Sequence, residues 1–575
     1  MRIIIIGGVA GGMSAATRLR RLEENAEIIV LERSGHVSFA NCGLPYHVGG
    51  VIPARKSLLL QTPQSLAARF RLDVRVLTEA VRIDRSARTV LVRDLRDGTE
   101  SELHFDKLIL SPGARPVRPP IPGIERALAL RDIEDTDAMV AAVDTAAAAA
   151  LNSQGFVSPE DADVLEGNVR ARATAVVVGG GFIGLEVAEN LVHRGLTVSL
   201  VEAMPQVMTP LDPEMVAPVH ATLRAAGVDL RLGASVTAIG PASVTLSNGE
   251  KIAADIVVAA IGVRPETSLA QDAGLTIGDK GGIAVDDHHR TSDPDIYAIG
   301  DAAEKVDALD GSATLVPLAN TANLAGRRVA DHIAGLPASN RPVLGTAIVK
   351  VFDLTVASTG WNEKRLRAAG RRYRAIHTHP GSHAGYYPGS ETMALKLLVD
   401  PDTDLILGAQ GVGGEGVDKR IDVIATAITG RLTASDLAEL ELAYAPPFGS
   451  AKDPVNMLGH VADNLRSGTT RSIQWHELDA AVAGGATVVD VRTPGEFAAG
   501  AIPGAVLLPV DELRDRIDEL PDGLLVVHCA VGIRGHTACR ILSQLGRDAV
   551  NLDGGYKTWA AGQASQQREL ETATA

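Results

Sequence analysis

Two strand–turn–helix–strand units, each with a glycine-rich first turn, constrain the fold of this chain more than any other feature. In the second unit, residues 175–178 read as a strand, 185–194 as a helix and 197–201 as the next strand. Its turn carries all three glycines of the dinucleotide-binding pattern: Gly179, Gly181 and Gly184. Such glycines let the backbone approach a pyrophosphate, and the helix N-terminus offers unpaired N–H groups to it. Glu202 closes the second strand, where a carboxylate can bind a free ribose 2′-hydroxyl, so the unit favours NADH over NADPH.

The first unit lies at the start of the chain and matches the pattern less closely. Residues 2–6 predict a buried parallel strand, residues 14–24 a helix and residues 27–31 a second strand that ends in an acidic residue. In the turn between strand and helix, Val9 stands where the second glycine of the pattern belongs. Alone, this turn does not separate dinucleotide binding from an ordinary strand–turn–helix. Two such units, each closed by a glutamate, make dinucleotide binding the better interpretation of both.

A third element indicates that one of the two nucleotides is a flavin. The strand at 296–301 ends in Gly-Asp and so presents a carboxylate at the carboxyl edge of a sheet. A helix after 317–319 would point its N-terminus at the flavin ring and stabilise negative charge there. Strands near 108–114 and 257–265 run into small residues that suggest chain crossings between a flavin domain and a nicotinamide domain inserted into it. For FAD, with NADH or NADPH at the second unit, we predict these further binding residues: Gly7, Gly8, Ala10, Gly11, Gly12, Glu32, Arg33, Ser111, Pro112, Gly113, Gly262, Gly300, Asp301, Pro317, Leu318 and Ala319.

Length, charge and cysteine usage bound the class of protein. A chain of 575 residues predicts three to five domains. The net charge of -15 argues against nucleic acid as the main partner. Three widely spaced cysteines make neither a disulfide framework nor a metal-ligand spacing, so we predict no metal and a reducing compartment. We find no signal-peptide pattern and no apolar stretch long enough for a membrane, and we expect a cytoplasmic protein.

Two of the cysteines lie in loops suited to chemistry. Cys42 follows the first nucleotide unit, in the stretch Ser38-Phe39-Ala40-Asn41-Cys42, and the next cysteine in the chain is Cys529. Cys42 therefore has no nearby cysteine to pair with, and its partner must be external: a ligand thiol, a sulfane sulfur or an oxygen atom. Cys529 follows a strand at 524–528 and precedes a helix that runs to about residue 541, so backbone N–H groups and Arg534 would favour its thiolate or persulfide. Cys539, within that helix, is predicted to be packed core.

These motifs resemble the pyridine nucleotide–disulfide oxidoreductases over about residues 1–458, specifically the coenzyme A-disulfide reductase and NADH-dependent persulfide reductase branch. Residues 473–562 resemble a rhodanese domain, with four residues between Cys529 and Arg534 as in sulfurtransferases. The resemblance implies an α/β fold class: two Rossmann-like dinucleotide-binding domains for FAD and NAD, an α+β dimerisation domain and a C-terminal α/β rhodanese domain. The implied parts are an FAD-binding domain at 1–115 and 246–335, an NAD(P)H-binding domain at 116–245 with an inserted segment near 145–172, a dimerisation domain at 336–458, a linker at 459–472, the rhodanese domain at 473–562 and a disordered tail at 563–575.

The resemblance also implies roles for individual residues. Ser38, Asn41 and Cys42 would face both the flavin and the substrate. The resemblance makes coenzyme A the implied partner of the α-helical face that carries Ser14, Arg18 and Arg21, because arginine binds phosphates in a bidentate way. Tyr386 and Tyr444 would reach Cys42 of the opposite subunit, so a homodimer would be the working unit. The remaining implied substrate contacts are Lys452 and Asn323, and Asn323 stands in place of a histidine found in some members. Phe70 stands where the family has a lysine of the coenzyme A pocket.

The implied function is reduction of persulfides, polysulfides, or coenzyme A persulfide and disulfide at Cys42 by NADH through FAD. The implied role of Cys529 is to accept sulfane sulfur and pass it to coenzyme A or another thiol, with Arg534 as part of that site. One alternative is an NADH oxidase or peroxidase that uses a cysteine sulfenic acid; Ala10 stands where those enzymes have a histidine. The other is a redox-sensing module whose rhodanese domain only docks partners. The physiological sulfur substrate stays open, as does the direction of sulfur transfer between the two cysteines.

Overall fold

The computed structural model describes residues 1–152 and 172–574. The predicted insert near 145–172 therefore lies mostly outside the described residues. The chain divides into two compact units: Met1–Ala203 with Gly227–Gly345 is unit 1, and Met204–Ala226 with Thr346–Ala575 is unit 2. Among the described residues, no helix is both long enough and apolar enough to cross a membrane.

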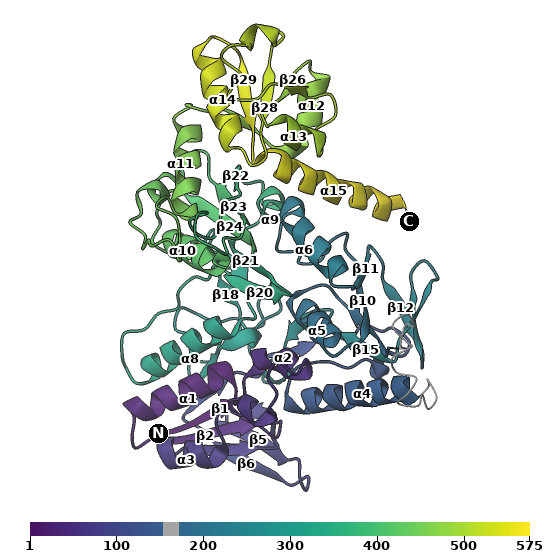
Figure 1. The fold of residues 1–575 in the computed structure, drawn as a ribbon. Coiled ribbons are helices and arrows are strands. Elements are labelled where there is room, and N and C mark those ends of the chain that lie inside the picture. Colours follow the sequence, from purple (N-terminus) through teal and green to yellow (C-terminus); the bar gives the residue numbers. More distant parts are fainter. Residues whose placement is uncertain (153–171, 575) are drawn as a thin grey trace. The chain divides into compact units, whose positions relative to one another are not determined.

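Unit 1 holds the two glycine-rich βαβ units of the sequence (Figure 1). Its helices and strands are β1 (Arg2–Ile6), α1 (Ala10–Leu22), β2 (Glu27–Glu32), α2 (Leu44–Val48), α3 (Pro63–Phe70), β3 (Asp73–Val76), β4 (Thr78–Asp84), β5 (Thr89–Asp94), β6 (Glu100–His104), β7 (Lys107–Leu110), β8 (Ala114–Pro116), α4 (Ile133–Asn152), β9 (Thr174–Val178), α5 (Phe182–His193), β10 (Thr197–Glu202), β11 (Asp229–Leu232), β12 (Val236–Ile239), β13 (Ser243–Leu246), β14 (Lys251–Ala253), β15 (Ile256–Ala259), β16 (Val263–Pro265), α7 (Ser268–Asp272), β17 (Ile296–Ala298), β18 (Lys305–Val306), β19 (Ala313–Thr314) and α8 (Ala319–Ile333).

Two parallel sheets organise unit 1. The first has the strand order β17-β7-β1-β2-β3, and its strands are buried on both faces because α1, α3 and α8 cover one side and β4–β6 with α7 the other. The second has the order β11-β10-β9-β15. The two predicted chain crossings pair with each other, since β8 and β16 form an antiparallel ribbon. In each sheet the glycine-rich turn lies at the carboxyl edge, where α/β folds bind nucleotides.

Unit 2 contains an antiparallel sheet and a parallel sheet. Its helices and strands are α6 (Pro213–Ala225), β20 (Ala347–Val351), β21 (Leu354–Gly360), α9 (Glu363–Ala368), β22 (Arg374–Thr378), β23 (Met393–Val399), β24 (Ile406–Gly413), α10 (Val417–Thr429), α11 (Pro454–Arg466), β25 (Ser472–Ile473), α12 (Leu478–Ala483), β26 (Thr487–Asp490), α13 (Pro494–Ala498), β27 (Val506–Leu507), β28 (Leu525–His528), α14 (Ile533–Gln544), β29 (Ala549–Leu552) and α15 (Gly555–Thr574). The antiparallel sheet has the order β20-β21-β24-β23-β22, with α10 and α11 packed on it. The parallel sheet, β25-β29-β28-β26-β27, belongs to the segment predicted as a rhodanese domain.

Three secondary-structure expectations need correction. Helix α1 begins at Ala10, within the glycine turn, and not near residue 14. The predicted linker is largely helical, because α11 continues to Arg466; a capping box between Asp453 and Asn456 starts it, and it buries an apolar stripe. The tail predicted to be disordered is the second half of α15, whose sequence lacks proline and packs against α6. The alanine run at 146–150 is helical, within α4.

Candidate active sites

Both glycine-rich turns form cradles that fit a dinucleotide. A Cβ on Gly12 would lie 1.9 Å from the carbonyl oxygen of Gly7, and a Cβ on Gly184 would lie 1.9 Å from that of Gly179, so both positions need glycine. The closing glutamates make the same contact in each unit, because the N–H of Gly8 donates to Glu32 at 2.8 Å and that of Gly180 to Glu202 at 2.7 Å. The carboxylates therefore lie beside the turns, where ribose hydroxyls of FAD and NADH would bind.

Cys42 lies on a short turn that joins the first cradle to α2. It is exposed, and the turn Asn41–Gly43 runs directly into α2. The backbone N–H of Ser38, a residue with φ of 49°, donates to the carbonyl of Gly8 at 2.8 Å. This bond ties the cysteine segment to the first glycine turn, so Ser38, Asn41 and Cys42 share the edge of the sheet that the flavin would occupy.

Two residues that the sequence analysis did not single out lie at this cysteine. Tyr46 is one helical turn beyond Cys42, and its hydroxyl donates to Glu186 Oε1 at 3.2 Å. Glu186 is on α5, the helix of the second cradle, and it interrupts an otherwise apolar segment. The sequence signal for Glu186 was a carboxylate among apolar residues. That signal does not predict its position near Cys42, which follows from the fold.

The electrostatic surroundings of Cys42 oppose loss of its thiol proton. Although the residue is exposed, the surrounding protein removes its thiol partly from water, and this desolvation raises the pKa of Cys42; the carboxylates of Glu186 and Asp301 raise it further. Burial also raises the pKa of Glu186 to about 7. Near neutral pH, Glu186 can therefore hold or release a proton beside the thiol.

The predicted carboxylate of the flavin site sits next to a buried lysine. Asp301 follows β17, and burial raises its pKa. Lys305 donates to the carbonyl of Gly300 at 2.8 Å, and burial lowers the pKa of this lysine to about 8. Lys305 is a third residue that the sequence analysis missed, and it supplies positive charge beside Asp301. The helix expected after residues 317–319 is α8, which begins within that stretch, at Ala319.

Helices α1 and α8 lie side by side in unit 1 and hold most of the predicted substrate contacts (Figure 1). Ser14 donates to the side-chain oxygen of Asn323 at 2.7 Å, so the structure brings these two predicted residues together. Arg18 forms an ion pair with Asp331 at 2.6 Å, and Arg21 is exposed on the next turn. One of the two predicted phosphate-binding cations is therefore already paired with a carboxylate.

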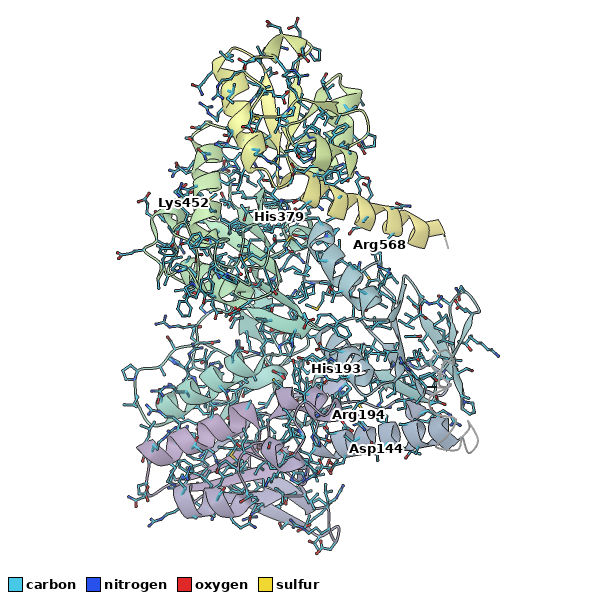
Figure 2. All side chains as sticks on the ribbon, in the orientation of Figure 1. Asp144, His193, Arg194, His379, Lys452 and Arg568 are labelled. Carbon is cyan, nitrogen blue, oxygen red and sulfur yellow. The ribbon has the colours of Figure 1, made fainter. Side chains whose placement is uncertain are left out.

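The predicted partner-facing residues lie on the surface of unit 2. The hydroxyls of Tyr386 and Tyr444 are 2.9 Å apart, and both side chains are exposed. Lys452 is exposed as well (Figure 2). Exposed aromatic residues with a paired polar tip suit an interface.

The Cys529 loop has the geometry expected of a sulfur-carrying site. Cys529 follows β28 and is buried, and the N–H of Gly532 donates to its Sγ at 3.2 Å. Gly532 has φ of 97°, which only glycine adopts without strain. Arg534 pairs with Glu496 at 2.6 Å, and this bond lowers the pKa of Glu496 to about 2. Glu496 thus orients the predicted site arginine, a role that the sequence analysis did not assign. Cys539 is buried core, as predicted.

Comparison with known protein families gives three matches along the chain. Residues 1–326 match the model described as pyridine nucleotide-disulphide oxidoreductase, and residues 346–454 match the dimerisation domain of that family. Residues 474–562 match the rhodanese-like domain.

Similar proteins span most or all of the chain. Coenzyme A disulfide reductase of Staphylococcus aureus (strain JH9) is 34% identical over 464 residues, which cover 80% of this chain and 99% of that protein. The solved structure of reduced Bacillus anthracis CoADR-RHD is 45% identical with a TM-score of 0.92, over 98% of both chains. The NAD-dependent persulfide reductase from A. fulgidus is 37% identical with a TM-score of 0.87, over 97% of this chain and 100% of that one.

Proposed function

The chain belongs to the pyridine nucleotide-disulphide oxidoreductase family, and from this premise we propose that it reduces persulfides and disulfides of small thiols at Cys42. The electrons come from NADH through FAD, and the rhodanese-like domain adds a sulfurtransferase site at Cys529. The observation that carries the proposal is the lone, exposed Cys42 tied by the Ser38 N–H to the first dinucleotide cradle. With no second cysteine within reach along its own loop, it has to form its disulfide with a substrate.

In one turnover, Cys42 and Glu186 of unit 1 take different roles. Cys42, as a thiolate, attacks the carbon-bound sulfur of a persulfide R–S–SH; the S–S bond breaks, HS⁻ leaves and a mixed disulfide Cys42–S–S–R remains. Bound FAD would supply the electron pair of NADH to this disulfide, which regenerates the Cys42 thiolate and releases RSH. The net change is NADH + RSSH → NAD⁺ + RSH + HS⁻. Glu186 accepts the thiol proton of Cys42 and can return it to the leaving thiol, because its pKa of about 7 lies near the working pH.

We assign coenzyme A or its persulfide as the thiol of first choice. One subunit supplies the α1–α8 surface, where phosphates would bind. This surface carries Ser14, Arg21 and Asn323. Tyr386 and Tyr444 would serve Cys42 of the second subunit of a homodimer, which is supported by the match to the dimerisation domain. We place the protein in the cytoplasm on the basis of its reduced, unpaired cysteines.

Cys529 would take sulfane sulfur from a donor and hand it to a carrier thiol, which becomes a persulfide that is then reduced at Cys42. Fusion of the two sites raises the effective concentration of a reactive persulfide at the reductase. Arg534 and the loop N–H groups hold the anionic persulfide, since buried backbone donors stabilise such charge.

The test is steady-state NADH oxidation by the FAD-loaded protein with coenzyme A persulfide, compared among three cysteine variants. Cys42→Ser should abolish reduction while FAD stays bound, and Cys529→Ser should abolish thiosulfate sulfurtransferase activity while reduction of small persulfides continues. Cys539→Ala is the matched control, expected to keep both activities because this thiol is packed core. Undiminished turnover in Cys42→Ser would contradict the proposal. Oxygen uptake without any sulfur substrate would point instead to an NADH oxidase.

A further inference from the structure

A network of buried charges runs through unit 2. Lys396 on β23 is fully buried, and its ammonium lies 2.9 Å from Asp212 and 2.5 Å from Glu363, and also contacts Glu214. These four residues come from β23, from α9 and from the segment that opens α6. Arg367 pairs with Glu363 as well. Asp212 and Glu214 are therefore the two carboxylates that share Lys396 and need a second cation.

His377 on β22 supplies that second cation. Its Nε2 lies 3.0 Å from Glu214 Oε1, and its Nδ1 lies 2.6 Å from Asp553 Oδ2. The backbone N–H of His377 also donates to Asp553, at 3.0 Å. Since both ring nitrogens face carboxylate oxygens, the imidazolium form satisfies all of these contacts. Burial alone would lower the pKa of His377, but its bonds to Asp553 and Glu214 outweigh burial and raise the pKa to about 9.

Asp553 belongs to the rhodanese-like domain and opens the segment that lies behind the sulfur loop. Gly554 and Gly555 follow it with φ of 67° and 63°. The next two backbone N–H groups then bind the loop: that of Tyr556 donates to the carbonyl of Cys529 at 2.8 Å, and that of Lys557 to the carbonyl of Ala530 at 3.0 Å. A Cβ on Gly555 would lie 2.5 Å from the Cys529 oxygen, so the segment is pressed directly against the loop.

We propose that His377 of the dimerisation domain is a positioning residue for the sulfur-carrying loop of the rhodanese-like domain. It fixes Asp553, Asp553 fixes the Gly554–Lys557 backbone, and that backbone holds the Cys529 loop from behind. The inference rests on the proposed sulfurtransferase role of Cys529. It makes the sulfur site dependent on a residue that lies outside the rhodanese-like domain.

The other groups around His377 are accounted for by their own contacts. The indole N–H of Trp475 donates to Glu214 at 3.3 Å, and the side-chain amide of Gln474 donates to Asp553 at 3.3 Å. Lys396 faces His377 from β23 and opposes its charge. These contacts add hydrogen bonds to the carboxylates, and none replaces the imidazolium between Glu214 and Asp553.

His379 gives an internal comparison on the same chain segment. Its side chain is labelled in Figure 2. Its Nε2 lies 2.8 Å from Thr558 Oγ1, which follows Lys557 in the same rhodanese segment. Burial lowers the pKa of His379 to about 3, so this contact is uncharged at working pH. Substitution of His379 therefore removes a domain contact without removing a charge, which makes His379→Gln the matched control.

The experiment compares thiosulfate:cyanide sulfurtransferase activity and NADH-dependent persulfide reduction in the full-length, FAD-loaded protein. His377→Gln and Asp553→Asn should each lower sulfurtransferase turnover roughly tenfold at pH 7, because small displacements of a reactive group are costly. The KM for thiosulfate and the reductase turnover should stay near wild type. The double variant should lose little more than either single variant, since both act through one bond.

The pH profile separates positioning by charge from a general loss of packing. The ratio of His377→Gln to wild-type turnover should rise toward one as pH passes about 9, because the wild-type imidazolium then loses its proton. The same ratio for His379→Gln should stay flat. Using the ratio cancels the titration of cyanide itself.

Each outcome has a distinct meaning. Wild-type sulfurtransferase turnover in both His377→Gln and Asp553→Asn would overturn the inference. Retained sulfurtransferase activity in Cys529→Ser would instead overturn the proposed function of that site. If His377→Gln fails to fold, as shown by loss of reductase turnover as well, Asp553→Asn decides the matter, because it keeps His377 and its bond to Glu214.

Discussion

At the scale of single residues, the reductase site poses one electrostatic problem. Cys42 must lose its proton to attack, yet burial and two carboxylates raise its pKa. Glu186 is the adjustable partner, because its own pKa of about 7 lets it become neutral in the range where enzymes work. Protonation of Glu186 removes one of the two negative charges that oppose the thiolate. A proton on Glu186 and a proton on Cys42 are therefore coupled.

Glu186→Gln should make Cys42 more reactive at neutral pH in the absence of NADH. The neutral amide removes the carboxylate that opposes the thiolate, so the rate of alkylation by iodoacetamide should rise several-fold. Glu125→Gln, an exposed site in the same unit, should leave the rate unchanged. Persulfide turnover of Glu186→Gln should fall, since the amide cannot accept a proton. An alkylation rate equal to wild type would show that Glu186 does not govern the thiol.

Sequence reasoning finds residues whose role is local and misses those that the fold assembles. Cys42, Cys529 and the glycine turns are recognisable from their neighbours alone. Glu186 lies far along the chain from Cys42, and Tyr46 reaches it only after α2 has formed. The pairing of Arg18 with Asp331 joins positions 313 residues apart, so spacing could not predict it.

At the scale of elements, the contact between α1 and α8 sets how much positive charge the proposed substrate surface offers. Asp331 on α8 pairs with Arg18 at 2.6 Å, and Arg327 lies 3.7 Å away on its other side. Both partners of the Arg18–Asp331 pair are largely shielded, with side-chain exposures of 21% and 16%, so solvent screens the pair less than a surface ion pair. Asp331 therefore withholds part of the charge of Arg18 from a phosphate.

Asp331→Asn should release that charge and favour substrates that carry phosphates. We expect the KM for coenzyme A persulfide to fall several-fold, because Arg18 is then free for bidentate binding. The KM for glutathione persulfide, which has no phosphate, should not change. Asp97→Asn makes the same change in net charge at an exposed turn and is the control. A higher KM for the coenzyme A substrate would show that Asp331 orients Arg18 for binding and does not compete for it.

The elements that sequence reasoning misread share one cause. The segments read as linker and tail are polar and lie at predicted domain ends, yet each forms a helix that packs against another element. Leu458 and Ala462 of α11 pack on the antiparallel sheet, and Ser565 of α15 donates to the carbonyl of Pro213 on α6 at 2.7 Å. Tertiary contacts, which polarity does not reveal, decide these helices.

At the scale of the whole molecule, the dimerisation domain and the rhodanese-like domain contribute side chains to one buried network. The dimerisation domain supplies His377, the rhodanese-like domain supplies Asp553 and Trp475, and α6 supplies Glu214, all buried in unit 2. Asp553 lies in the segment that matches the rhodanese-like domain, so that domain supplies the carboxylate that pairs with His377.

The stability of unit 2 should therefore fall at alkaline pH in a way that depends on His377. Its pKa is about 9 in the folded protein and 6.5 for an ordinary histidine, so the contribution is full below pH 6.5 and is lost as pH rises through 9. A difference of this size corresponds to about 3 kcal/mol of free energy of unfolding. All three tryptophans lie in unit 2, at positions 361, 475 and 559, so tryptophan fluorescence follows this unit separately from the flavin site. Between pH 7 and pH 10 the urea midpoint should fall more for wild type than for His377→Gln, while His379→Gln should run parallel to wild type. If the urea midpoints of wild type and His377→Gln fell in parallel with pH, loss of a proton from the buried imidazole would not destabilise unit 2.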